Sequence, residues 1–188
     1  MSPFEAVLVD LDGTLVDTSD VNYQAYAAAL TEVGVRIERA AFDRQAHGRN
    51  WKQFLPAMLA DAGIATDPAA IARRKSELYA GLIAQARPNH ALIKLLGMLK
   101  PLCRTALVTT ASAINAGAVL NTHDLRRLFD VIVTGDDVRR HKPDPEGYVL
   151  AARQLGVAPE ACLVIEDTDI GVASAHAFGS KVLKVQMQ

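Results

Sequence analysis

The chain has 188 residues, of which 50% are hydrophobic and 22% are charged, and its formal net charge at pH 7 is -1. This length favours one domain that carries a large insertion over two complete domains. The nearly balanced charge gives no reason to expect nucleic acid or an anionic membrane as a partner, so a small molecule is the favoured partner.

The composition also bears on cellular location. Cys103 and Cys162 are far apart and form no CxxC pair, which predicts reduced thiols in a cytoplasmic protein. No leader pattern opens the sequence and no apolar stretch reaches transmembrane length. We therefore expect a soluble protein that is not exported, either a monomer or a weak dimer.

The first predicted strand, Ala6 to Val9, is followed by Asp10-Leu11-Asp12-Gly13-Thr14. Side chains at i and i+2 of a strand point to the same side, so Asp10 and Asp12 can face one pocket, while Gly13 permits the turn that follows. Two carboxylates ~4 Å apart repel each other by roughly 4 kcal/mol at an effective dielectric of about 20. This repulsion predicts a divalent cation at the strand end.

The segment after this strand, from Ser19 to Arg87, is rich in Ala and has helical spacing of its apolar residues. Glycines and Pro68 interrupt it, which predicts about four helices that form a separate unit. We assign residues 17–87 to this insertion. Residues 1–16 and 88–188 are assigned to the core.

Strands and helices alternate again after Pro88. Further short apolar runs lie at Thr105 to Val108, Val131 to Val133, Cys162 to Ile165 and Val182 to Val185. This alternation predicts an α/β fold with a mainly parallel sheet that helices cover on both faces.

Polar residues follow two more of these strands: Thr109-Thr110 and Glu166-Asp167. A single strand-end Asp is usually a helix cap, but ligands of open α/β sheets bind outside the carboxyl ends of the strands, where all these residues fall. Lys142 precedes a helix for which Asp144 is the predicted N-cap, and it can reach the same crevice. One lysine does not balance four carboxylates, so the excess negative charge predicts Mg2+.

These residues resemble the haloacid dehalogenase (HAD) superfamily. Four motifs match in order over nearly the whole chain: DLDGTLVDT from Asp10, VTT from Val108, HKPDPEGY with Lys142, and VIEDTDIG with Glu166 and Asp167. The insertion resembles the small helical cap of the subgroup with β-phosphoglucomutase-like and phosphoglycolate-phosphatase-like members. The resemblance implies a Rossmann-like core, a site closed by the cap, and Mg2+-dependent phosphoryl transfer.

The resemblance also implies roles for individual residues. Asp10 attacks the phosphorus to form an aspartyl-phosphate, and Asp12 protonates the leaving oxygen and later deprotonates the water. The groups that hold the phosphoryl oxygens are Thr109, the amide of Thr110 and Lys142. The implied Mg2+ ligands are Asp10, the carbonyl of Asp12, Asp167, and Glu166 directly or through water.

Two other chemistries occur in this superfamily. Dehalogenases lack an acid at the position of Asp12, which is present here. Phosphonatase-like members use a cap lysine that forms an imine, and Lys52 and Lys75 lie in the corresponding region. We expect both to be solvated helix lysines, because an imine lysine needs an apolar setting.

The resemblance also implies that the cap selects the substrate. The stretch from His47 to Lys52 joins two predicted helices and combines a glycine with cations, so His47 and Arg49 are expected to bind the substrate. Arg49 in particular is expected to bind a carboxylate, hydroxyl or second phosphate. An equally good interpretation is a helix connection in which Asn50 is the N-cap and Trp51 packs inside the cap.

We therefore predict a Mg2+-dependent phosphatase for a small phosphorylated metabolite, such as a sugar phosphate or phosphoglycolate. A phosphomutase remains open, because it differs in keeping water from the aspartyl-phosphate, which a sequence does not show. A silent regulatory protein on the same scaffold also remains open. The intact acids and Lys142 argue against it, since a binding module has no need of so repulsive a cluster.

Overall fold

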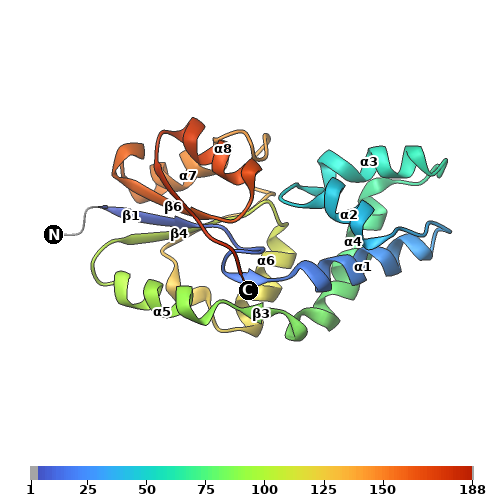
Figure 1. Cartoon of the computed structure of the whole chain (residues 1–188), viewed down its shortest axis with the longest axis horizontal. Helices are drawn as coiled ribbons and strands as arrows, with labels where there is room; N and C mark the ends of the chain where they lie inside the picture. The colour runs from blue at the N-terminus through green and yellow to red at the C-terminus, as the bar shows by residue number, and fades with distance from the viewer. Residues whose placement is uncertain (1–3, 188) are drawn as a thin grey trace.

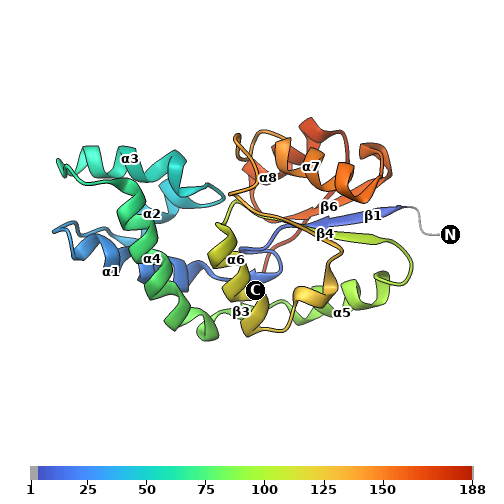
Figure 2. The same ribbon diagram turned by 180° about the vertical axis from the view of Figure 1, so that it is seen from behind.

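A computed structural model describes residues 4–187 of the chain. Figures 1 and 2 show two parts side by side, a sheet between layers of helices and a group of helices beyond one end of that sheet. Along residues 4–187 no helix is long and apolar enough to cross a membrane.

The sheet has five strands in the order β5-β4-β1-β6-β7, and every neighbouring pair is parallel. Their bounds are β1 Ala6–Val9, β4 Arg104–Val108, β5 Val131–Val133, β6 Cys162–Glu166 and β7 Lys181–Lys184. Because β1 is central, with Val9 opposite Leu107 of β4 and Ile165 of β6, the residues that follow it lie in the middle of the carboxyl edge. The predicted α/β class with a parallel sheet is confirmed.

Alternating side chains of the strands form a core on each face of the sheet. Val7 and Val9 pack on one side, whereas Ala6 and Leu8 pack on the other. Helices α5 (His90–Leu99) and α6 (Ala113–Thr122) cover the first face, and α7 (Glu146–Leu155) and α8 (Asp169–Phe178) cover the second. Short 3-10 helices lie at η1 Ile83–Gln85, η2 Arg126–Leu128 and η3 Pro159–Ala161.

The helical part contains the four helices expected between Ser19 and Arg87. They are α1 Ser19–Thr31, α2 Arg39–Ala46, α3 Trp51–Asp61 and α4 Pro68–Leu82. An aromatic cluster of Tyr26, Phe42 and Phe54 lies at their centre, with ring centroids 5.4 to 6.1 Å apart. We call these helices the cap, and we keep the assignment of residues 17–87 as a separate domain as a proposal.

Both connections between the cap and the sheet run through one short ribbon. Strands β2 (Val16–Asp17) and β3 (Arg87–Pro88) are antiparallel, and Arg87 forms an ion pair with Asp17 at 2.5 Å. Beyond β3, the Asn89 side chain caps α5 and donates to the carbonyl of Thr14 at 3.1 Å. The return from the cap is thereby tied to the loop that follows β1.

Candidate active site

The predicted core residues meet at the carboxyl edge of the sheet, beside a pocket between the core and the cap. The pocket has about 950 Å³ of free space, part of it open to solvent. Its walls include Asp10, Asp12, Thr110, Lys142 and Glu166 from the core, and His47 and Arg49 from the cap. Thr109 and Asp167 lie behind this wall rather than in it, although each contacts a group that faces the pocket.

Lys142 provides the positive charge among the acids. Its side chain is 6% exposed, and its Nζ lies 2.6 Å from Asp10 Oδ1, 2.6 Å from Glu166 Oε1 and 3.0 Å from the carbonyl of Val108. Burial alone would lower the pKa of Lys142, but Asp10, Tyr148 and Glu166 outweigh burial and raise it. The amine is therefore charged at neutral pH.

The loop that carries Lys142 ends differently from the prediction. Pro145, not Asp144, is the N-cap of α7. Asp144 lies one residue earlier and its side chain accepts from the N–H of Glu146 at 3.0 Å, so it still satisfies an N–H of the first turn. Lys142 itself lies ahead of the helix, as expected.

Three carboxylates form a cluster with the composition of a site for a hard cation. One oxygen each of Asp10, Glu166 and Asp167 lie within 4.8 Å of one another. Oxygen ligands of this kind fit Mg2+. Burial raises the pKa of Asp10 well above its usual value, and the neighbouring acids add to the rise while Lys142 opposes it. The ionised form of Asp10 therefore needs a further positive charge nearby.

Glu166 already accepts hydrogen bonds at both oxygens. Its Oε1 accepts from Lys142 and from the Tyr148 hydroxyl at 3.0 Å, and its Oε2 accepts from the N–H of Asp167 at 3.0 Å and from Thr168 at 3.2 Å. Burial alone would raise the pKa of Glu166, but these partners lower it. This arrangement favours contact with a cation through water over direct ligation.

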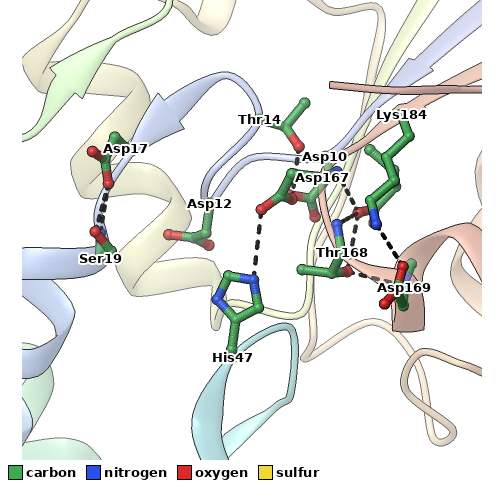
Figure 3. A network of polar contacts seen from close by, with 12 residues as sticks. Asp10, Asp12, Thr14, Asp17, Ser19, His47, Asp167, Thr168, Asp169 and Lys184 are labelled. Atoms are coloured by element: carbon green, nitrogen blue, oxygen red, sulfur yellow. Dashed lines mark hydrogen bonds and ion pairs between the residues drawn. The ribbon is translucent and has the colours of Figure 1, made fainter. Parts of the chain in front are cut away.

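Asp12 lies outside the three-carboxylate cluster, next to two hydroxyl groups. Thr18 donates to one oxygen of Asp12, and Thr109 donates to the other at 3.4 Å. Figure 3 shows the carboxyl group of Asp12 set apart from that of Asp167. The two hydroxyls fix the orientation of Asp12, which lines the pocket.

Asp167 is held by the turn after β1 and lies near a histidine of the cap. Thr14 donates to its Oδ1 at 2.9 Å, and His47 Nε2 lies 3.8 Å from its Oδ2, as Figure 3 shows. Gly13 has φ +88° and a Cβ there would collide with the carboxylate of Asp167. Glycine is therefore required at this turn on two grounds, its backbone conformation and the close approach.

The two predicted substrate-binding residues of the cap differ in their placement. His47 points toward Asp167, as described above. The guanidinium of Arg49 lies at the pocket rim and donates to the carbonyl of Gln45 at 2.9 Å, at the end of α2. The alternative role of the same stretch is present too, because Asn50 is the N-cap of α3 and Trp51 packs against the cap cluster.

The structure contradicts the solvated environment predicted for Lys75. It is not solvated but 3% exposed, on the pocket wall, with Nζ 3.9 Å from the ring centre of Tyr79 and 5.1 Å from that of Tyr26. Burial lowers its pKa from 10.5 to about 7, against a smaller opposing effect of Asp12. The sequence carried a signal, since Lys75 lies four residues from both Ile71 and Tyr79 on the buried face of α4. Lys52 is exposed as expected.

The sequence analysis also missed Tyr148. Its side chain is fully buried in α7, donates to Glu166 Oε1, and places its ring 5.2 Å from Lys142 Nζ. A tyrosine on the apolar face of a helix needs a partner for its hydroxyl, which was the available signal. Burial raises the pKa of Tyr148, so its hydroxyl remains a donor.

Comparison with known proteins agrees with this fold and site. Residues 4–179 match the family of haloacid dehalogenase-like hydrolases. Because the match covers most of the chain, the chain belongs to this family and is an enzyme. The resemblance based on the four motifs is confirmed.

Individual relatives are similar over nearly the full chain. Fructose-1-phosphate phosphatase YqaB of Escherichia coli (strain K12) is 28% identical, over 98% of this chain and 97% of its own. Beta-phosphoglucomutase of Bacillus subtilis (strain 168) is 26% identical, over 93% and 80%. The crystal structure of CbbY from Rhodobacter sphaeroides in complex with phosphate is 29% identical, with a TM-score of 0.89 over 98% of this chain and 87% of that one.

Proposed function

We propose that this chain is a Mg2+-dependent phosphatase of a small phosphorylated metabolite, most closely a sugar phosphate. The observation that carries the proposal is the contact of the buried Lys142 with Asp10 and Glu166 at 2.6 Å each, at one wall of a pocket between the core and the cap. The named activity of the relative YqaB, a fructose-1-phosphate phosphatase, supports the substrate class.

The donor set fits Mg2+ as cofactor. Asp10 and Asp167 would hold it with the backbone carbonyl of Asp12, and Glu166 would act through water because its oxygens are already engaged. When bound, the ion neutralises the carboxylates and the phosphoryl oxygens. Lys142 and the cation together balance a cluster that one lysine leaves negative.

Asp10 and Asp12 have different roles in the proposed reaction. A carboxylate oxygen of Asp10 forms a bond to phosphorus as the bond to the leaving oxygen breaks, and Asp12 gives that oxygen its proton. Asp12 then takes a proton from water, whose oxygen attacks the phosphorus and releases phosphate and free Asp10. Lys142, Thr109 and the amide of Thr110 stabilise the charge on the phosphoryl group.

The cap wall of the pocket supports a polar leaving group with an apolar face. Tyr26 and Tyr79 lie there beside the amine of Lys75, and Phe54 lines the same pocket. Sugars stack their C–H faces on aromatic rings and offer hydroxyls to an amine. We propose that Lys75 contacts a hydroxyl or an anionic group of the substrate. Arg49 is proposed to contact the same substrate from the rim.

A panel of sugar phosphates and other phosphate esters tests the function, with phosphate release measured with and without Mg2+. We expect release from at least one sugar phosphate that depends on Mg2+ and falls by roughly a thousandfold or more in Asp10→Asn. Asp169→Asn is the matched control, because Asp169 is an exposed acid paired with Lys184 outside the pocket. Release that survives Asp10→Asn would refute the covalent step.

The same panel of substrates tests the phosphomutase alternative. A mutase would convert a phosphosugar to its isomer faster than it releases phosphate, because it keeps the aspartyl-phosphate from water. If isomer formation dominates, the phosphatase proposal fails while the roles of Asp10 and Asp12 stand. If neither phosphate nor an isomer forms with any substrate, both the phosphatase and the phosphomutase proposals fail.

Two expectations about the cell and the assembly are kept as proposals. Cys103 and Cys162 are both unpaired, which suits a reducing compartment and hence a cytoplasmic location. A monomer or weak dimer is proposed for solution. Size-exclusion chromatography over a range of concentrations tests the second proposal.

A further inference from the structure

The first turn of α3 is held by a capping box between Asn50 and Gln53. The side-chain oxygen of Asn50 accepts from the N–H of Lys52 at 3.1 Å, and the N–H of Asn50 donates to Gln53 Oε1 at 2.8 Å. Each side-chain amide thus uses its oxygen for the helix. Each keeps an NH2 group for another acceptor.

Both NH2 groups donate to the core, each to a different loop of the site. Asn50 Nδ2 donates to the carbonyl of Thr110 at 2.7 Å, and Gln53 Nε2 donates to the carbonyl of Lys142 at 3.2 Å. Each amide thus has an N–H on its oxygen side and a carbonyl on its nitrogen side, which fixes its orientation. Thr110 and Lys142 are the residues proposed to hold the phosphoryl group.

Gly135 shows how closely the segments meet at this point. Its N–H donates to the carbonyl of Ala111 at 2.7 Å. A Cβ at Gly135 would lie 2.6 Å from Asn50 Nδ2 and collide with the carbonyl of Thr110. The loops after β4 and β5 and the start of α3 therefore meet with no space for another side chain.

We propose that Asn50 and Gln53 are positioning residues that clamp the Thr110 and Lys142 loops to the cap and fix the geometry of both phosphoryl-binding groups. The choice of amides fits this role. Asp or Ser at Asn50 and Glu at Gln53 would cap α3 equally well, but a carboxylate has no hydrogen to donate, and the Ser hydroxyl ends one bond short of the Nδ2 that reaches the carbonyl of Thr110. The catalytic effect rests on the proposed function, whereas the clamp itself does not.

Substitutions that keep the cap of α3 and remove only the donor test this proposal. Asn50→Ser and Gln53→Glu are each expected to lower kcat by about tenfold, equivalent to about 1.4 kcal/mol. Both variants are expected to stay folded at the assay temperature, with a lower unfolding midpoint because a core carbonyl loses its donor. Gly135→Ala, a substitution in the core, is also expected to lower kcat, because the added Cβ would disturb the contact of Asn50 with Thr110. Asp67→Ser is the matched control, because Asp67 caps α4 through the N–H of Ala69, is exposed and contacts no core loop.

Hydrogen–deuterium exchange gives a readout that needs no substrate. The backbone amides of residues 109–111 and of His141, Lys142 and Asp144 are expected to exchange faster in Asn50→Ser and Gln53→Glu than in wild type or Asp67→Ser. Unchanged exchange in both variants overturns the clamp, and kcat within twofold of wild type in both overturns its effect on catalysis. A wild type that releases no phosphate refutes the proposed function, and the exchange data still decide on the clamp.

Discussion

The amine of Lys75 lies against two tyrosine rings, with its Nζ 3.9 Å from the centre of Tyr79. Aromatic faces attract a cation but replace only part of the hydration that burial removes. The charged form is therefore costly in the folded chain, and the amine is poised between its two states at neutral pH. A ligand with an anionic group would favour the charged state, and a hydroxyl could pair with either.

Lys75→Met is expected to be more stable than the wild type at pH 7. The pKa of Lys75 is about 7 in the folded chain and 10.5 usually, so the unfolded chain binds more protons between these values and the free energy of unfolding rises with pH across this window. Each pKa unit corresponds to about 1.4 kcal/mol. Urea unfolding at several pH values measures the rise, which should be absent from Lys75→Met.

The control for this effect is Lys52→Met, which removes an exposed amine from the same cap. It should leave both the stability and its pH dependence unchanged. If Lys75→Met shows the wild-type slope, the amine is not desolvated. The same variant should raise KM for the best substrate if the proposed contact with the leaving group is correct.

Tyr148→Phe is expected to lower kcat by about fivefold to tenfold and stability by about 1–2 kcal/mol, because Glu166 loses a donor at a buried oxygen. Tyr23→Phe is the matched control. The Tyr23 hydroxyl donates to the carbonyl of Ile37 at 3.1 Å within the cap, away from the acids. Enzyme assays and urea unfolding of both variants separate the two effects, and equal kcat in the two would contradict a positioning role of Tyr148.

At the scale of elements, α8 lies so close to the end of β6 that Gly171 has no space for a methyl group. A Cβ there would collide with the carboxylate of Glu166. Because of this close approach, Glu166 lies against the start of α8, where its Oε2 accepts from the N–H and the hydroxyl of Thr168. The helix thereby sets the orientation of an acid that holds Lys142.

Gly171→Ala and Gly117→Ala form a pair of equal substitutions inside two helices. Gly171→Ala is expected to cost about 1–3 kcal/mol and most of the activity, because Glu166 must move. Gly117 of α6 has open space at its Cβ, so Gly117→Ala should stabilise by about 0.5–1 kcal/mol with unchanged activity. Thermal unfolding and kcat measurements of both variants test these expectations. A functional Gly171→Ala would show that Glu166 has another position available.

The elements were predictable where one local rule decides them. Apolar runs predicted the five strands, and the polar residues at the carboxyl ends of β1, β4 and β6 lie together because parallel strands end at one edge. What the sequence did not show depends on packing between distant segments. Thr18 was not assigned to Asp12, Lys75 was placed in solvent, and the contact of Asn50 with Thr110 spans 60 positions of the chain. Local periodicity carries no information on such partners.

At the scale of the whole molecule, the cap and the sheet share part of one apolar core. Val21 and Ala25 of α1 and Tyr79 of α4 belong to the same cluster as Val9 and Leu107 of the sheet. The outer cap has its own cluster around Phe42 and Phe54. The inner ends of the cap helices therefore contribute to the stability of the core.

We expect the cap and core to unfold together because of this shared cluster. Trp51 is the single tryptophan of the chain and lies in the cap, so its fluorescence reports that part, while circular dichroism reports both. The two urea transitions should coincide, as in a two-state reaction. A tryptophan transition at clearly lower urea would show that the cap unfolds separately. Tyr79→Ala should shift both transitions together.

The ribbon of β2 and β3 has a consequence for how this protein family can vary. Val16 pairs with Pro88, so the points where the chain leaves the sheet layer and returns to it are direct neighbours. An inserted segment can therefore begin and end there without changing the register of β1, β4 or β6, provided that its inner helices fill the core that they share with the sheet. The residues proposed to react and the cap residues proposed to contact the leaving group are thus separable along the chain. If the proposed role of the cap is correct, an exchange of residues 19–86 for the corresponding segment of a relative is expected to change substrate choice and leave the acids in place.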